Sequence, residues 1–158
     1  TKQVYDSVRI SHTNCRTDDN LVFHGETFKI QSTYVIHYAD IIRNVIYNMF
    51  KHSIDASDGK RHFVINIQIL EDELMLHFVN ETDTDSEVLN SIFREKIRND
   101  KHILDEGGSG IAKANKILKC DLNNNENSIA MKAENGKCYT DIVIKLQNFK
   151  VYEKDINN

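Results

Sequence analysis

Two asparagines lie one helical turn apart in a segment whose apolar spacing is typical of a helix. They are Asn44 and Asn48, and Lys51 follows about one turn later. Asparagine forms helices less readily than Lys, Glu or Gln, so a face that needed only to be solvated would more often carry charges. An amide oxygen suits Mg²⁺ as a ligand, and a lysine can meet a phosphate as a point charge. We therefore favour a site for Mg²⁺ and a phosphate-bearing ligand, such as a nucleotide, over a solvated polar face.

A second candidate is the glycine-rich turn "GGSG" at residues 107–110, followed by Ile111 in an expected helix. Glycines let backbone amides turn toward an anion, and the start of a helix presents unpaired N–H groups. No Lys-Ser or Lys-Thr pair follows Gly110, so this is not a Walker loop. The dinucleotide fingerprint also fails, because it needs a strand directly before it and a further glycine. Alone, the turn fits phosphate binding and a simple change of chain direction equally well.

Apolar periodicity predicts the elements that must position these residues. Opposite the two asparagines, the helix has an apolar arc made of Tyr38, Ile42, Val45, Ile46 and Met49. The expected elements are short strands at 4–10 and 21–25 with a polar loop at 13–20 between them, a helix at 31–53, a hairpin at 62–80 turning at 71–72, a helix at 86–97, a helix at 111–119, and strands at 128–133 and 138–146 joined by a turn at 135–136. They predict an α+β two-layer sandwich, with helices on one face of a mixed, mostly antiparallel sheet.

Length and composition narrow the class of protein. The 158 residues fit a single domain spanning 1–158, and 40% hydrophobic with 28% charged residues is typical of a globular protein. A net charge of −4 without a basic cluster argues against nucleic-acid binding, and no apolar run is long enough for membrane contact through a spanning helix. The three cysteines lie far apart, which fits reduced thiols in a cytoplasmic protein. The start at Thr1, without a leader, suggests a segment of a longer protein.

In this order, four stretches resemble the boxes of the GHKL superfamily of ATP-binding domains, and most strongly the catalytic ATP-binding domain of sensor histidine kinases. "NVIYNMFKHS" (44–53) is similar to the asparagine box of these kinases, N-[LV]-x-x-N-A-x-[KR]-[YH]-[ST]. "LMLHFVN" (74–80) is similar to the strand before the first glycine box. "GGSGIAKANKIL" (107–118) resembles the later glycine box and its helix, and "CYTDIVIKL" (138–146) resembles the closing strand. The resemblance covers residues 31–146 and implies a Bergerat-type ATP-binding fold.

The resemblance also implies roles for individual residues. Asn48 would supply an oxygen ligand to Mg²⁺, Lys51 would contact a phosphate, and Asn80 would accept a hydrogen bond from the adenine amino group. The segment 81–106 would form a lid over ATP. The residues expected to contact ATP are Asn44, Asn48, Lys51, His52, Asn80, Gly107, Gly108, Ser109, Gly110 and Ile111, with Asn48 as the metal ligand.

Some positions depart from the family pattern. The usual D-x-G-x-G is replaced by Asn-Glu-Thr-Asp-Thr at 80–84, which removes both glycines, although an asparagine at the first position is also found in one branch of sensor kinases. Met49 stands where the family prefers alanine. Hydrolytic members carry a glutamate one turn before the metal-binding asparagine, where it activates water. Here that position is Asn44, which cannot take a proton, so the pattern favours a kinase over an ATP-hydrolysing enzyme.

Three functions are compatible with this resemblance. In the first, the chain binds Mg-ATP and positions it for transfer to a histidine outside the chain, on a dimerisation and phosphoacceptor domain, with a response regulator as a further possible partner. No catalytic residue is assigned within the chain, because His37 and His52 lie in the asparagine-bearing helix itself. In the second, a degenerate member of the superfamily serves as an interaction scaffold. In the third, the chain is a stand-alone protein-serine kinase of the anti-sigma type.

Overall fold

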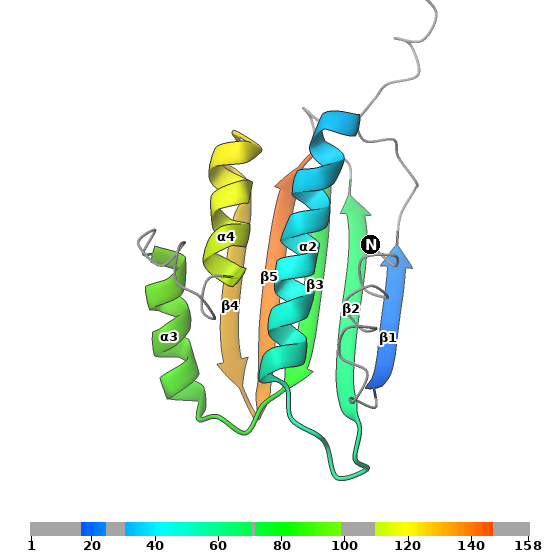
Figure 1. Ribbon diagram of the computed structural model, residues 1–158, viewed down its shortest axis with the longest axis vertical. Helices are drawn as coiled ribbons and strands as arrows, with labels where there is room; N and C mark the ends of the chain where they lie inside the picture. Colours follow the sequence, from blue (N-terminus) through cyan, green and yellow to red (C-terminus); the bar gives the residue numbers. More distant parts are fainter. Residues whose placement is uncertain (1–16, 25–30, 71, 99–109, 147–158) are drawn as a thin grey trace, which may run out of the picture.

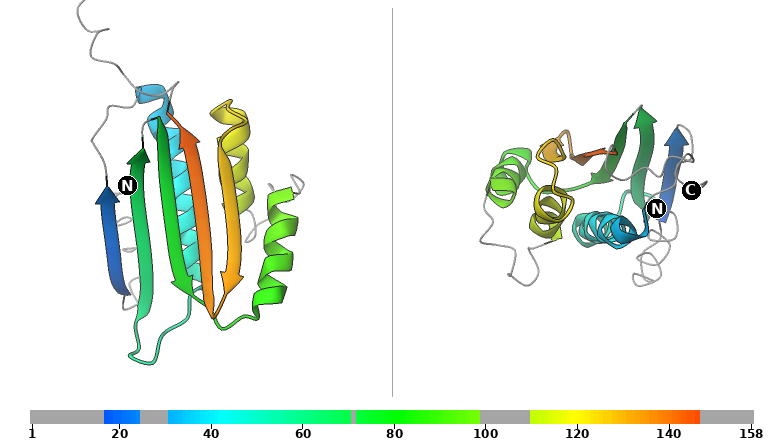
Figure 2. Two further views of the ribbon diagram at one scale, coloured as in Figure 1. Left: turned by 180° about the vertical axis from the view of Figure 1, so that it is seen from behind. Right: turned by 90° about the horizontal axis from the view of Figure 1, so that it is seen from above.

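A computed structural model of the chain describes residues 17–24, 31–70, 72–98 and 110–146. The elements in this part of the chain are β1 (Thr17–His24), α2 (Ser32–His52), β2 (Arg61–Leu70), β3 (Glu73–Glu81), α3 (Ser86–Arg98), α4 (Gly110–Lys116) with a π-helical turn (Ile117–Asp121), β4 (Ser128–Glu134) and β5 (Lys137–Lys145). Helices α2 and α4 cover one face of the sheet, and α3 lies beside the strand at its edge (Figures 1 and 2).

The strands form one five-stranded sheet in the order β1-β2-β3-β5-β4. Strand β1 pairs with β2 in parallel, and the other neighbours pair antiparallel. The hairpin between β4 and β5 turns at Asn135 and Gly136, whose φ angles of 51° and 73° are those that a tight hairpin turn needs. This arrangement confirms the predicted α+β sandwich with a mixed, mostly antiparallel sheet.

The N-terminal part of the described chain differs from the prediction. A polar loop is expected at residues 13–20, but Thr17–Asn20 belong to β1, where Thr17 pairs with Arg61 and Asn20 with Val64. Backbone pairing with β2 supplies the hydrogen bonds whatever the polarity of the side chains, so a polar run can still form an edge strand. The strand expected at 4–10 lies outside the described residues. The predicted helix at 111–119 begins at Gly110 and widens into the π-helical turn.

The core lies between α2, α4 and the inner face of the sheet. Strand β3 alternates as predicted, with Leu74, Leu76 and Phe78 each 1% exposed. The helix residues packed against the strands are Ile41, Ile42, Val45, Ile46, Met49 and Phe50. Because this arc is buried, the arc that carries the two asparagines faces away from the sheet's centre and along the helix flank. No helix in the described ranges is long and apolar enough to cross a membrane.

An arginine from β2 fixes the C-terminal end of α2. Arg61 Nη1 donates to the carbonyl oxygen of Phe50 at 2.7 Å, and its Nε donates to Asp55 at 2.9 Å. A cation at this position satisfies an unpaired helix carbonyl and complements the partial negative charge of the helix end. The ring of Phe50 also packs on Phe63 with 4.7 Å between ring centroids. The last turn of α2, which carries Lys51 and His52, is thereby held against β2.

An asparagine holds α3 against the edge of the sheet. Asn90 Nδ2 donates to the carbonyl oxygen of Ala133 at 2.9 Å, and the Ala133 N–H donates to Asn90 Oδ1 at 2.8 Å. The side-chain amide thus continues the hydrogen bonding of edge strand β4 in place of another strand. This contact seats Phe93, one turn later, on Ala133 and Cys138. Helix α3 is therefore part of the folded body and can form a wall of a cavity beside the sheet.

Candidate functional site

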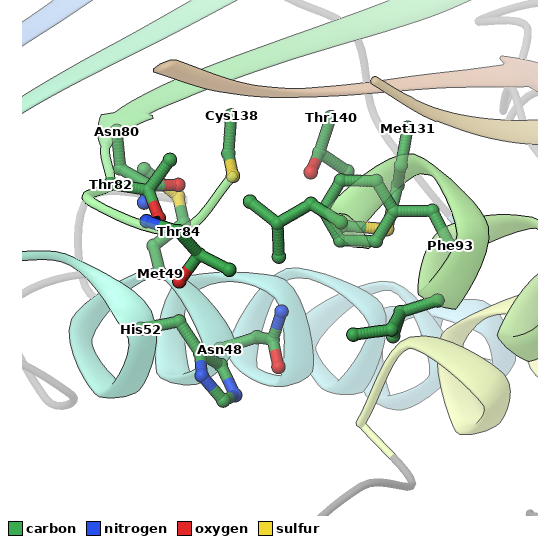
Figure 3. Close-up of a pocket in the computed structure, with 12 residues that line it drawn as sticks. Asn48, Met49, His52, Asn80, Thr82, Thr84, Phe93, Met131, Cys138 and Thr140 are labelled. Carbon is green, nitrogen blue, oxygen red and sulfur yellow. Dashed lines mark hydrogen bonds between the residues drawn. The ribbon is translucent and has the colours of Figure 1, made fainter. Parts of the chain in front are cut away.

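A cavity of about 230 Å³ lies between the last turns of α2, the inner face of the sheet and α3. We call it the α2–α3 pocket (Figure 3). Its polar lining residues are Asn48, His52, Asn80, Thr82, Thr84 and Thr140. Its apolar lining residues are Met49, Leu89, Ile92, Phe93, Met131 and Cys138. The asparagine-bearing helix and the end of β3, which are distant in sequence, therefore meet at one cavity.

Two largely buried residues on the pocket wall, Asn80 and Thr140, each carry a polar group that a ligand could use. Asn80 is 6% exposed and Thr140 is 4% exposed. Asn80 Nδ2 donates to the Glu81 carbonyl oxygen at 3.2 Å, which leaves Oδ1 as a hydrogen-bond acceptor. Among the described residues, neither Asn80 Oδ1 nor the Thr140 hydroxyl is hydrogen-bonded, and both side chains line the pocket (Figure 3). A ligand with matching groups could therefore form hydrogen bonds with both.

Threonines shape the loop that follows β3, where the family pattern has glycines. The N–H of Thr84 donates to Thr82 Oγ1 at 3.2 Å, which closes a short side-chain turn. The N–H of Thr82 donates to the carbonyl oxygen of Gly136 at 2.9 Å, and a Cβ at Gly136 would stand 3.7 Å from the Thr82 carbonyl oxygen. The β4–β5 turn thus supports this loop. The loop is built without the two glycines and still borders the pocket.

The first residue of α4 packs directly on α2. A Cβ at Gly110 would stand 3.4 Å from the carbonyl oxygen of Asn44 and 3.9 Å from its side-chain Oδ1. Asn44 Nδ2 donates to the carbonyl oxygen of Asp40 at 2.8 Å, which orients Oδ1 toward this contact. The end of the glycine-rich turn and the first asparagine of the box are therefore neighbours, and Asn48 lies one turn further along α2, in the pocket.

Three of the residues predicted to contact ATP lie in the pocket: Asn48, His52 and Asn80. Asn48 is half-buried, so its amide is open to a ligand and is still held by the helix. Met49, which replaces the family's alanine, is 4% exposed and forms part of the apolar wall. Its larger side chain is therefore accommodated at the boundary between the core and the pocket.

The other predicted residues lie elsewhere or are not described. Lys51 is exposed and does not line the pocket. Ile111 is 2% exposed and belongs to the core, so its side chain is inaccessible and only its backbone can meet a ligand. Gly107, Gly108 and Ser109 lie outside the described residues. In the predicted lid at 81–106, residues 86–98 form α3, which packs on β4.

The sequence interpretation missed Thr140 and the contribution of α3. In β5 the inward positions are Cys138, Thr140, Ile142 and Ile144, so Thr140 is the polar exception in an apolar series. That interruption of a period-two pattern was a usable signal. No comparable sequence signal indicated that Phe93 lines the pocket, because the amphipathic pattern of α3 does not show which part of the fold the helix packs against.

Among the described residues, those that line the pocket include no carboxylate, lysine or arginine. Burial raises the pKa of the Cys138 thiol above its usual value, and a hydrogen bond with Thr82 offsets part of this effect. A lining of amide, hydroxyl, methionine and aromatic groups suits a flat, neutral ligand group that has both apolar faces and polar edges.

Comparisons with known proteins identify the fold. No family model matches the sequence, and no curated protein matches it either. Among solved structures, the catalytic domain of histidine kinase ThkA matches with a TM-score of 0.67 at 10% identity, covering 92% of this chain and 91% of that one. The Acinetobacter baumannii histidine kinase AdeS matches with 0.61 at 13% identity, covering 93% of this chain and 65% of that one. The Erythrobacter litoralis EL346 blue-light activated histidine kinase matches with 0.65 at 11% identity, covering 98% and 42%.

Proposed function

Because this chain has the fold of histidine-kinase catalytic domains, as its motifs predicted, we propose that it is a Mg-ATP-binding domain of a histidine-kinase-like protein. The observation that carries the proposal is that Asn48 from α2 and Asn80 from β3 line the same pocket. These are the residues that the family resemblance assigns to the metal and to adenine. Their separation in sequence makes their meeting at one cavity a strong support for a shared ligand.

The inner half of the pocket suits adenine. Asn80 Oδ1 is held as an acceptor, because Nδ2 already donates to the Glu81 carbonyl oxygen. An acceptor here pairs with the amino group of adenine and opposes the carbonyl oxygen of guanine. The Thr140 hydroxyl can donate to a ring nitrogen of adenine. Met49 and Phe93 supply the apolar surface against which a flat base would pack.

The triphosphate and the metal belong at the α2 side of the pocket. The donor set fits Mg²⁺, since Asn48 supplies a neutral oxygen and Mg²⁺ commonly keeps several water ligands when it binds a nucleotide. Asn44, Lys51 and Gly110 would approach the phosphates. Mg²⁺ held by Asn48 would offset part of the charge of the phosphate oxygens.

The chain's own residues would hold ATP without hydrolysing it. Asn44 occupies the position of the general base of the hydrolytic relatives and cannot accept a proton. The acceptor histidine and the protein partner that carries it are then supplied from outside the domain. We therefore expect binding without appreciable turnover by the isolated chain, and phosphoryl transfer after a phosphoacceptor domain is added.

Isothermal titration calorimetry with Mg-ATP tests this function. We expect a saturable heat for the parent chain, at least tenfold weaker binding for Asn48→Ala, and weaker binding when EDTA removes Mg²⁺. Asn66→Ala is the matched control, because Asn66 is a half-buried amide in a second groove that Asn48 does not line. Absence of heat at millimolar Mg-ATP would contradict nucleotide binding. It would favour the scaffold function, which the loss of both glycines in the first box also supports.

A further inference from the structure

Cys138 places a thiol in the wall of the α2–α3 pocket. It lies on the inward side of β5, is 8% exposed, and packs with Phe93 and Ala133. Its sulfur points from the sheet toward α2, into the space that the lining residues surround (Figure 3). The thiol is therefore open to a molecule inside the pocket and covered from other directions.

The groups beside Cys138 independently indicate a ligand. Asn80 pairs with Cys138 across the sheet, and Thr140 follows two residues later on the same face. Both are more than nine-tenths buried, and the Asn80 Oδ1 and Thr140 hydroxyl meet no partner in the described chain. A small molecule that bonds to these groups would rest its body against the sulfur.

The environment of Cys138 makes it unreactive toward molecules that do not bind in the pocket. Burial raises the pKa of the thiol, so the nucleophilic thiolate is scarce at neutral pH. Cys120 is exposed and offers a contrasting thiol in the same chain. A reagent held in the pocket gains a high effective concentration near the sulfur, which compensates for the scarcity of thiolate.

We propose that Cys138 is a covalent-modification site for α,β-unsaturated carbonyl compounds whose flat body fits the pocket. The Cys138 sulfur attacks the β-carbon and forms an S–C bond. The π electrons of the C=C bond move toward the carbonyl group, and the resulting enolate takes up one proton, which balances the proton lost by the thiol. The addition needs no oxidant or reductant. It extends beyond nucleotide binding and does not depend on it, since the product is an adduct of the pocket itself.

The test uses the full chain with Cys15→Ser and Cys120→Ser, so that Cys138 is the remaining thiol, together with a matched chain that also carries Cys138→Ala. N-phenylacrylamide and acrylamide are the probes, and intact mass followed by peptide mapping reports the adduct. We expect one adduct, on Cys138, and a rate that saturates with N-phenylacrylamide concentration. At low concentration that rate should exceed the acrylamide rate by about tenfold or more, owing to pocket binding. Thr140→Val should reduce this preference.

Urea-unfolded protein provides the reference for the intrinsic reactivity of the two probes. In urea, the preference for N-phenylacrylamide should fall to the ratio of their reactivities with a free thiol. The proposal is overturned if the folded chain keeps that free-thiol ratio, or if no Cys138 adduct forms under conditions that fully alkylate Cys120 in the unmutated chain.

Discussion

The backbone of Gly110 lies against Asn44, and a Cβ added at position 110 would stand only 3.4 Å from the Asn44 carbonyl oxygen. This contact brings the start of α4 to the face of α2 that carries the asparagines. It joins two motifs that are separated in the sequence and that the proposed function assigns to one ligand. Substitutions at this contact and around the pocket beside it should therefore have distinct and measurable effects.

A larger side chain at position 110 should push α4 away from α2, and the effect should grow with the size of the side chain. Gly110→Ala makes an ordinary van der Waals contact and should change the free energy of unfolding by less than about 1 kcal/mol. Gly110→Val adds two methyl groups beyond that Cβ, close to the Asn44 backbone, and should destabilise the fold by about 1–3 kcal/mol through overpacking. Urea unfolding curves measure both. Equal stability of the two variants would show that the helices have more room than the structure indicates.

Removing the Asn90 amide should loosen α3. Asn90→Ala loses two hydrogen bonds to Ala133, and we expect a loss of about 1–2 kcal/mol in the free energy of unfolding. Hydrogen exchange should accelerate in α3 ahead of the other helices. Ser91→Ala, at the exposed neighbouring position, serves as the control. If α3 exchanges at the same rate in both variants, the Asn90–Ala133 contact does not hold it.

Asn80 should determine which base the pocket accepts. Asn80 lines the pocket, and its Nδ2 donates to the Glu81 carbonyl oxygen, which leaves Oδ1 as the acceptor. Asn80→Ala should therefore weaken ATP binding by about tenfold, the value of one hydrogen bond. The affinity for GTP should change little in this variant, because Asn80 Oδ1 and the carbonyl oxygen of guanine are both acceptors and form no hydrogen bond with each other. Competition titrations of ATP against GTP measure the ratio. An unchanged ratio in the variant would place the base elsewhere.

The Asp58 turn should contribute stability that depends on pH. The Lys60 N–H donates to Asp58 at 2.9 Å, and this bond, with nearby His62 contributing, holds the pKa of Asp58 below its ordinary value of 3.8. A group whose pKa is lower in the folded state stabilises the fold above its unfolded-state pKa, and this contribution disappears as the pH falls through the folded-state pKa. Asp58→Asn should therefore lower the Tm slightly at pH 7, with the difference vanishing as the pH falls through the folded-state pKa of Asp58. A difference that persists in acid would point to a cause other than the charge.

Much of the fold was predictable because its main elements have strong periods. Apolar residues recur with the helical period in α2 and alternate with polar residues in β2 and β3. The structure places the ends of α2 and of the β2–β3 hairpin within two residues of the prediction. Strand β1 was partly missed because Thr17–Asn20 are polar and enter the sheet through backbone pairing. The π-helical turn at Ile117–Asp121 was not predicted, because five residues are too few for apolar periodicity to distinguish a π-helix from an α-helix.

The candidate site was predictable only in part for a different reason. The motif resemblance pointed to Asn48 and Asn80, because the motifs are defined by residue types and spacing, which are visible in the sequence. The Asn90–Ala133 contact joins a side chain to backbone groups, and Asn127 similarly accepts from the Lys145 N–H and donates to the Leu118 carbonyl oxygen. In such contacts one residue contributes only its backbone N–H or C=O, so its amino-acid type does not indicate the contact. They are therefore visible only after the chain has folded.

An NMR titration of the ¹⁵N-labelled chain with Mg-ATP tests nucleotide binding in the α2–α3 pocket most directly, because it shows both whether the nucleotide binds and where. We expect saturable shift changes concentrated at Asn48, Asn80 and Thr140. Met75 and His77, in the second groove, should remain unchanged. Binding in the pocket would be contradicted by spectra that do not change at millimolar Mg-ATP, or by changes that centre on the second groove and leave the α2–α3 pocket unaffected.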